Sequence, residues 1–256
     1  MLQAAAWRTL ARRYAAISPD LLFIELLNEP AVPLDIWQSQ SASLARTLRT
    51  LLPQHTLILA SADFQQAYRL LQTAPIADRN VVYAVHFYEP MSFTHQGADW
   101  NPADPVAALS AIPFPLTREA PSVRAHLAGL KQRGLMAAAD LLARDSARDW
   151  TKARIDDTMR GLADWSRRHT RPVLINEFGV LKWKAPAADR LRWLEAVRTG
   201  AERHCLGWTH WEFDEAFGFL TRTNTGVTLD ETVLRACAFG TLAIFLYPAL
   251  FELNQH

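Results

Sequence analysis

The sequence predicts an α/β fold in which helices alternate with the strands of a parallel sheet. Five short runs of apolar, β-branched and aromatic residues are nearly continuous, as is typical of strands buried on both faces of a parallel sheet. They occupy residues 21–27, 56–60, 81–87, 171–177 and 205–211. Helical periodicity precedes or separates these runs at residues 3–17, 34–52, 64–73, 151–169 and 186–203. This alternation predicts right-handed crossovers between parallel strands.

Two architectures share this order of elements, a (β/α)8 barrel and an open, doubly wound sheet. The sequence has no Gly-rich phosphate turn after a strand, which disfavours a nucleotide-binding doubly wound protein. Residues 91–150 form a long Pro-rich segment after the third apolar run. We expect this segment to be a functional loop, because loops of such length in compact domains usually are.

Composition limits the kind of protein and its partners. The chain has 256 residues, of which 50% are hydrophobic and 21% charged, so we expect a single globular domain over residues 1–256. The net charge is +1, so we expect neither a nucleic-acid partner nor attraction to an anionic membrane. Cys205 and Cys237 are too few for a disulfide framework or a four-cysteine zinc site.

The two ends of the sequence are where a signal peptide or a terminal membrane anchor would lie. The first residues show helical periodicity in place of a signal peptide. Residues 236–251 are nearly all apolar, but this stretch is shorter than the roughly 20 residues of a membrane span and contains Pro248. The pattern favours a buried terminal helix over a membrane anchor.

Polar side chains gather where the predicted strands end. The strand-end segments are Asn28-Glu29-Pro30, His86-Phe87-Tyr88, Asn176-Glu177-Phe178-Gly179 and His210-Trp211-Glu212. Barrel enzymes build their active sites at the carboxyl ends of their strands. We therefore expect these four segments to form one site.

Glu29 and Glu177 are the candidate catalytic pair, because each follows an Asn at a strand end. Glycoside hydrolysis requires two carboxyl groups, one to protonate the leaving oxygen and one to attack the anomeric carbon or activate water. A separation of about 5–5.5 Å gives retention of configuration, and about 6.5–9.5 Å gives inversion. Spacing in the sequence leaves both outcomes open. Paired His ligands and an HExxH motif are absent, so we expect no metal and no cofactor.

Four segments in this order resemble glycoside hydrolase family 5, the cellulase family. Leu26–Pro30 is similar to its acid/base motif, and residues 175–179 are similar to its nucleophile strand. Residues 86–100 resemble its sixth strand with the following loop, and residues 208–219 resemble its eighth strand. The similarity extends over about residues 20 to 220.

This resemblance implies a retaining (β/α)8 hydrolase of β-glucosidic bonds, with β-1,4-glucan as the leading substrate. β-1,3-Glucan, mannan and β-glucosides remain alternatives. Glu29 would be the acid/base and Glu177 the nucleophile. The implied substrate-binding residues are Asn28, His86, Tyr88 and Trp211.

The sequence departs from the family at its beginning. The Asn-Glu-Pro strand is normally the fourth of eight, whereas only the helix at residues 3–17 precedes it here. We therefore expect an N-terminally incomplete barrel lacking three β/α units, and a secreted or periplasmic location for the full-length form. An inactive carbohydrate-binding pseudoenzyme is the alternative from another class. The oligomeric state is left open.

Three further residues have structural interpretations. Glu25 is two strand repeats before Glu29 and is expected to be a structural carboxylate that needs a partner. Trp37 and Trp183 follow strands and are expected in the core or on a helix surface.

Overall fold

The computed structural model describes residues 2–223 and 226–237. The chain forms two compact units. The first unit comprises Met1–Phe87, Thr158–Glu177 and Ala201–Thr209, and the second comprises Tyr88–Asp157, Phe178–Gly200 and His210–His256. The apolar stretch at 236–251, for which the sequence favours a helix, lies outside the described residues from position 238 onward.

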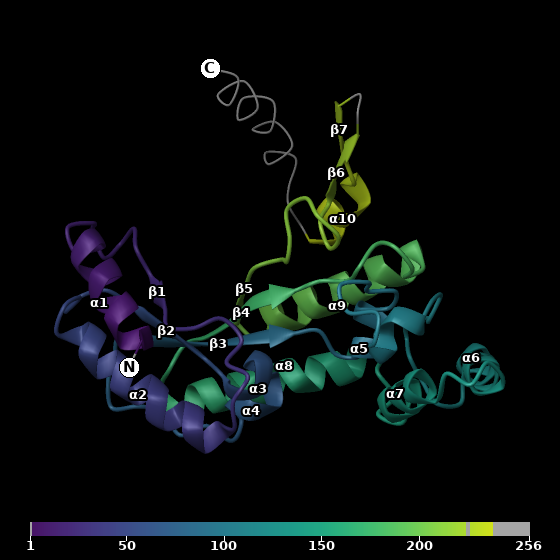
Figure 1. Cartoon of the computed structure of the whole chain (residues 1–256), viewed down its shortest axis with the longest axis horizontal. Helices are drawn as coiled ribbons and strands as arrows, with labels where there is room; N and C mark the ends of the chain where they lie inside the picture. The colour runs from purple at the N-terminus through teal and green to yellow at the C-terminus, as the bar shows by residue number, and fades with distance from the viewer. Residues whose placement is uncertain (1, 224–225, 238–256) are drawn as a thin grey trace. The chain divides into compact units, whose positions relative to one another are not determined.

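A five-stranded sheet forms the centre of the first unit, and its strands neighbour one another in chain order (Figure 1). The strands are β1 (Ile24–Glu25), β2 (Leu57–Ala60), β3 (Val81–Phe87), β4 (Val173–Phe178) and β5 (Gly207–Trp208). β1 with β2, β2 with β3, and β4 with β5 are parallel pairs. A doubly wound sheet reverses its strand order at a switch point, so the sequential order is that of a barrel wall.

β1 is shorter than the run at residues 21–27 predicts. Leu21 is 79% exposed and Phe23 is 55% exposed, so the start of this run is not strand buried on both faces. β1 is at one end of the described strand order and has a ladder partner on one side only. One-sided pairing supports fewer backbone hydrogen bonds, which limits the strand to two residues.

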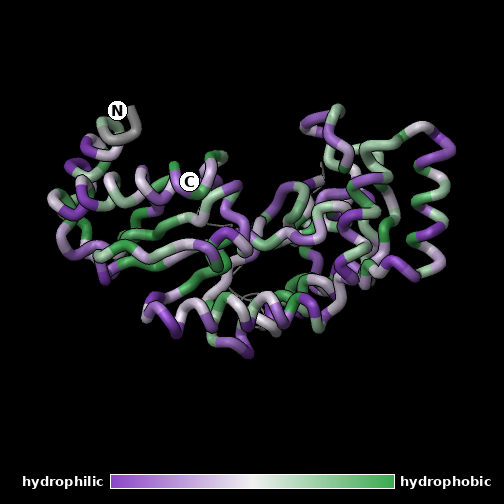
Figure 2. Tube along the Cα trace, turned by 90° about the horizontal axis from the view of Figure 1, so that it is seen from below, coloured by the Kyte–Doolittle hydropathy of each residue, from purple (hydrophilic) through white to green (hydrophobic). Residues whose placement is uncertain are grey.

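Helices connect these strands where the periodicity predicts, except that the single helix expected at residues 64–73 is wrong. Two four-residue elements stand there, because Asp63 and Phe64 have left-handed φ values of 56° and 59°. They are α1 (Leu2–Tyr14), α2 (Leu34–Arg49), α3 (Ala62–Gln65), α4 (Ala67–Leu70), α8 (Lys152–His169) and α9 (Ala187–Arg203). Figure 2 shows apolar residues running along the extended segments and alternating with polar residues along the helices. In the described part of the chain, no helix combines the length and apolar character that crossing a membrane requires.

Two buried tryptophans hold helices against the sheet by packing and hydrogen bonding. Trp37 of α2 is 2% exposed and donates from Nε1 to the carbonyl of Ala60, at 2.7 Å. Trp165 of α8 is 1% exposed, donates to the carbonyl of Thr73 at 3.1 Å, and meets the ring of Tyr83 edge-on at 4.9 Å. Both indoles are buried without an unpaired N–H, as stable burial of Trp requires. The prediction of a core role for Trp37 is confirmed.

The second unit contains the segment at residues 91–150, and our expectation of a loop there is wrong. The segment contains α5 (Met91–Thr94), a 3₁₀ turn η1 (Pro105–Ala108), α6 (Pro121–Gln132) and α7 (Met136–Ser146). Pro121 stands in the first turn of α6, and Ala and Leu fill much of both longer helices. Proline is favoured in a first turn and Ala and Leu are strong helix formers, so local propensity accounts for the difference.

A hairpin and a short helix complete the second unit. β6 (Leu220–Thr223) and β7 (Gly226–Leu229) pair antiparallel and precede α10 (Glu231–Ala236). Arg190 of α9, 4% exposed, donates to the carbonyls of Val180, Phe217 and Gly218 at 3.0, 2.8 and 3.0 Å. This guanidinium fixes the loop that leads into the hairpin, because each contact satisfies a carbonyl in a buried setting.

We predict that Trp165→Ala lowers the free energy of unfolding by about 3–5 kcal/mol, because it leaves a cavity and an unpaired carbonyl. Urea denaturation followed by circular dichroism measures this change. Arg168→Ala, an exposed change on the same helix, is the control and is expected to stay within about 0.5 kcal/mol of the unmodified protein. Equal effects of the two substitutions would contradict the assignment of Trp165 as an anchor.

Candidate active site

Three strand ends of the first unit bring Glu29, His86 and Glu177 together. One oxygen from each carboxylate and one ring nitrogen of His86 all lie within 4.8 Å of one another. His86 Nδ1 is 2.8 Å from Glu29 Oε1 and 3.3 Å from Glu177 Oε2. Parallel strands place their carboxyl ends at the same edge, which is why residues far apart in the sequence meet.

Exposure differs strongly across this trio. The side chain of His86 is 2% exposed, that of Glu177 is 12% exposed and that of Glu29 is 38% exposed. The imidazole therefore forms the floor of the site, and the two carboxylates are accessible from solvent to different degrees. A neutral imidazole donates one hydrogen bond from Nδ1, and a protonated one pairs electrostatically with both carboxylates.

The backbone of Glu29 is held by an unexpected residue. Glu29 has a left-handed φ of 47°, and its N–H donates to Gln65 Oε1 at 3.0 Å. Gln65 is fully buried at the end of the tight turn formed by α3. No sequence motif pointed to this glutamine.

Gln65 also joins two other strand ends. Its Nε2 donates to Glu25 Oε1 at 2.9 Å and to Asn176 Oδ1 at 3.0 Å. Asn176 Nδ2 in turn donates to Glu25 Oε1 at 3.0 Å. The half-buried Glu25 thus has the partners that the sequence predicted it would need.

The remaining sequence-predicted residues fall in different places. Asn28 is exposed and directly precedes Glu29. Tyr88 and Trp211 belong to the second unit. There the Tyr88 ring packs against His95 at 5.0 Å and Phe217 at 5.7 Å, while Trp211 is 42% exposed. The structure therefore brings Glu29 and Glu177 into contact with His86. Tyr88 and Trp211 belong to the other compact unit, where the ring of Tyr88 packs against residues of that unit.

Two carboxylates and an imidazole are also the side-chain types that ligate divalent metals. In the described residues, this trio is the group whose ligand atoms lie close enough to hold an ion. His86 Nδ1 and Glu29 Oε1 are at ordinary hydrogen-bond distance, 2.8 Å. This pair is therefore in direct hydrogen-bond contact, an arrangement that suits acid/base chemistry.

Two groups of the second unit have strongly shifted pKa values. Burial raises the pKa of Glu89 to about 7, and the nearby Asp145 carboxylate adds to the shift. Burial lowers the pKa of His210 to about 4, assisted by the charge of Arg190. His210 is therefore neutral near pH 7, whereas Glu89 titrates in that range.

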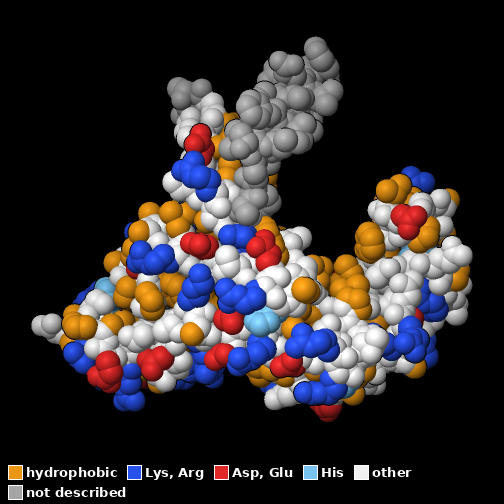
Figure 3. Space-filling view, turned by 180° about the vertical axis from the view of Figure 1, so that it is seen from behind, with side chains coloured by type: hydrophobic (Ala, Val, Ile, Leu, Met, Phe, Trp, Pro, Cys, Tyr) orange, Lys and Arg blue, Asp and Glu red, His pale blue; other side chains and the backbone are white. Residues whose placement is uncertain are grey.

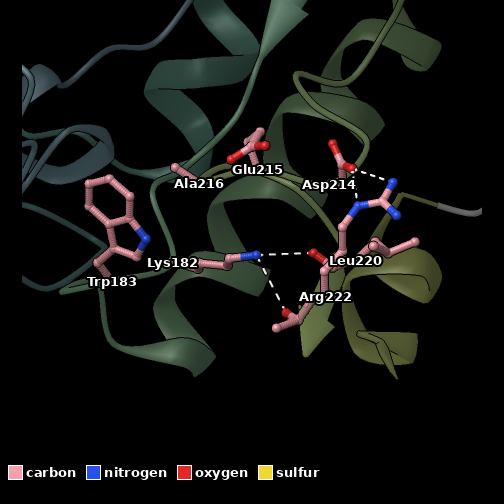
Figure 4. Close-up of a pocket in the computed structure, with 8 residues that line it drawn as sticks. Lys182, Trp183, Asp214, Glu215, Ala216, Leu220 and Arg222 are labelled. Atoms are coloured by element: carbon pink, nitrogen blue, oxygen red, sulfur yellow. Dashed lines mark hydrogen bonds and ion pairs between the residues drawn. The ribbon is translucent and has the colours of Figure 1, made fainter. Parts of the chain in front are cut away.

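The second unit also contains a cavity of about 230 Å³ (Figure 4). Its charged groups are mostly paired: Lys182 Nζ donates to the carbonyl of Leu220 at 3.1 Å, and Arg222 forms an ion pair with Asp214 at 2.8 Å. Trp183 at its edge is 46% exposed, so the prediction of a core or helix-surface role is wrong. It lies in a loop before α9, 6.5 Å from the ring of Trp100, which is 58% exposed.

Charge on the surface is mixed. On the face drawn in Figure 3, Lys and Arg side chains are interspersed with Asp and Glu side chains. The distribution agrees with the net charge of +1 and forms no continuous basic field on that face.

Comparison with known proteins identifies relatives of this chain. The family model Cellulase (glycosyl hydrolase family 5) matches residues 3–214. Endoglucanase 3 of Fibrobacter succinogenes is 28% identical over 241 residues, which cover 91% of this chain and 35% of that protein.

Solved structures agree on the fold. An endoglucanase gives a TM-score of 0.73 at 22% identity, covering 93% of this chain and 65% of that one. Cel5A of Thermotoga maritima in complex with cellobiose gives 0.69 at 23% identity, covering 92% and 65%. The chain therefore spans about a third of the Fibrobacter protein and 65% of each of these structures. The (β/α)8 fold class predicted from the sequence is confirmed, and because the family match covers most of the chain, this chain belongs to glycoside hydrolase family 5.

Proposed function

We propose that the protein is a retaining glycoside hydrolase that cleaves β-1,4-glucan in the manner of an endoglucanase. The observation that carries this proposal is the approach of Glu29 and Glu177, with one oxygen of each within 4.8 Å. Retaining enzymes hold their carboxyl groups about 5–5.5 Å apart, whereas inverting enzymes need about 6.5–9.5 Å to admit a water. The short separation supports direct attack by a carboxylate.

The two carboxyl groups differ in the way that a double displacement requires. Glu29, the more exposed, donates its proton to the departing glycosidic oxygen as the C–O bond breaks. Glu177, the more enclosed, attacks the anomeric carbon and forms a glycosyl ester. In the second step Glu29 takes a proton from water, the water oxygen attacks the anomeric carbon, and the Glu177 carboxylate leaves.

His86 has a positioning and electrostatic role in this proposal. Its Nδ1 contacts both carboxylates from the buried side of the site. A proton on Nδ1 stabilises whichever carboxylate is ionised, so the ring accommodates the exchange of charge between the two steps. Its own enclosure keeps the ring in one orientation, since few rotamers fit a side chain that is 2% exposed.

The substrate assignment is supported by relatives. Endoglucanase 3 is named for cleavage within a glucan, and Cel5A has been solved with cellobiose and with mannotriose. Mannan therefore stands as the alternative substrate, and we propose Asn28, Tyr88 and Trp211 as sugar contacts. We also propose that one catalytic domain contains this chain and acts outside the cytoplasm, where polymeric glucan is encountered.

A carbohydrate-binding pseudoenzyme is the second candidate. The exposed rings of Trp100 and Trp183 favour it, because indole faces stack on sugar rings without any need for catalysis. Turnover distinguishes the two candidates. A pseudoenzyme binds glucan and releases no sugar, whereas the hydrolase releases reducing ends.

We predict that Glu177→Ala and Glu29→Ala each lower kcat/KM on soluble cellulose at least about 10³-fold, because each removes one partner of the double displacement. Added azide should restore turnover of an activated aryl β-cellobioside with opposite product stereochemistry. Glu29→Ala should give the β-glycosyl azide and Glu177→Ala the α-glycosyl azide, as identified by proton NMR. Activity above a tenth of normal in either variant would refute these assignments.

We further predict that His86→Ala lowers kcat/KM about 10- to 100-fold while the protein stays folded, because both carboxylates lose their shared contact. Initial rates on an aryl β-cellobioside and a urea unfolding curve measure the two effects. The half-buried His126 on α6 provides the matched control, and His126→Ala should leave the rate within twofold. A His86 variant with a normal rate would show that the imidazole does not organise the site.

A further inference from the structure

We infer that Gln65 is a positioning residue for hydrolysis, fixing the backbone of Glu29 relative to the strand end that carries Asn176 and Glu177. This inference rests on the proposed function. It adds a residue that takes no direct part in the double displacement by Glu29 and Glu177. Gln65 contacts no reacting atom. It acts through the groups that it holds.

The carboxamide of Gln65 makes three hydrogen bonds, all to residues of the site. Its oxygen accepts from the N–H of Glu29 at 3.0 Å, and its nitrogen donates to Glu25 Oε1 at 2.9 Å and to Asn176 Oδ1 at 3.0 Å. The opposite orientation would direct NH₂ at a backbone donor and oxygen at two oxygen acceptors. The partners therefore fix the orientation of the amide.

Burial makes these three contacts consequential. Gln65 is 0% exposed, so water does not replace a lost partner without rearrangement. A buried polar group left unpaired destabilises the folded state, because it has given up its hydrogen bonds to water. The position of the Glu29 backbone N–H therefore depends on this carboxamide.

The backbone around Gln65 is strained in a way that serves this contact. Three consecutive non-glycine residues are left-handed: Asp63, Phe64 and Gln65 have φ values of 56°, 59° and 62°. Left-handed non-glycine residues are unfavourable and persist where the surrounding structure fixes them. A second tie holds the same turn to the Glu29 segment, because Phe64 N–H donates to the carbonyl of Pro30 at 3.3 Å.

The two sides of the site depend on Gln65 to different degrees. Without Gln65, Asn176 keeps its hydrogen bond to Glu25, at 3.0 Å, so the nucleophile strand retains a support. Glu29 loses the acceptor of its backbone N–H and keeps the side-chain contact with His86, while Phe64 still holds the neighbouring Pro30. Loss of Gln65 should therefore impair the acid/base more than the nucleophile.

Leaving-group dependence tests this asymmetry. Phenyl β-cellobioside needs proton donation from Glu29, whereas 2,4-dinitrophenyl β-cellobioside leaves without it. For Gln65→Ala, we expect kcat/KM to fall about 10- to 100-fold on the phenyl substrate and less than threefold on the dinitrophenyl substrate. Both rates are measured on the full chain. A mere loss of stability would lower both rates equally.

Gln66→Ala is the matched control. Gln66 is the half-buried neighbour of Gln65, and its backbone carbonyl accepts from Ser61 Oγ at 2.9 Å. Its side chain takes no part in the hydrogen bonds that join Glu29, Glu25 and Asn176. Both substrates should react within twofold of the normal rate in this variant. If Gln65→Ala does not fold, Gln65→Met keeps the volume and removes the hydrogen bonds, and the same pattern is expected from it.

The outcomes separate the inference from the proposed function. No turnover of any β-glycoside by the unmodified protein would refute the function alone. Crystal structures of the unmodified protein and the Gln65 variant then decide the inference, which requires the Glu29 backbone nitrogen to shift by more than about 0.5 Å. Equal losses on both substrates, normal rates on both, or an unmoved Glu29 would overturn the positioning role.

Discussion

The contact of one imidazole with two carboxylates is the interaction on which the rest of the site depends. When both carboxylates are ionised, oxygens within 4.8 Å of each other repel by at least about 3 kcal/mol at an effective dielectric constant of 20. His86 lies against both, at 2.8 and 3.3 Å, and offsets this repulsion from the buried side. The pair can therefore remain close enough to act on one bond between them.

The parallel sheet supplies the geometry that this contact requires. β3 carries His86 at its carboxyl end, and six of its seven residues are buried, so the ring is fixed by a well-packed strand. β1 and β4 deliver the glutamates to the same edge. Gln65, at the end of the turn after β2, fills the space between these strand ends with one carboxamide. Four consecutive strands of the sheet thus each contribute a group to the site.

The sequence predicted Glu29 and Glu177 as a candidate catalytic pair and His86 as a substrate-binding residue, but it did not predict Gln65, whose carboxamide holds the Glu29 backbone. Glu29, His86 and Glu177 were visible because polar residues at the ends of apolar runs are conspicuous, and because their motifs resemble those of a known family. Gln65 was not visible, because it belongs to a left-handed turn built from non-glycine residues. Sequence patterns assign such turns to glycine or asparagine, so tertiary contacts decide this one.

The dependence on tertiary contacts also explains where the observed fold differs from the predicted one. Strand order and the helices between strands follow from periodicity, which depends on local burial. The helices between residues 121 and 146 lie in a segment expected to be a loop, because its prolines mask a strongly helical composition. Trp183 is expected in the core or on a helix surface, whereas it is 46% exposed in a loop whose backbone is held by distant residues. Lys182 N–H donates to the carbonyl of Ala216, and the carbonyl of Lys184 accepts from the N–H of Ala111.

Trapping the covalent intermediate is the most direct test of the central claim. A 2-deoxy-2-fluoro-β-cellobiosyl fluoride slows both steps and, in a double displacement, leaves its sugar on the nucleophile. Mass spectrometry of the intact protein and of its proteolytic peptides should show one added fluorosugar, attached to Glu177. A label on another residue, or an unlabelled protein that still hydrolyses cellobiosides, would contradict the account.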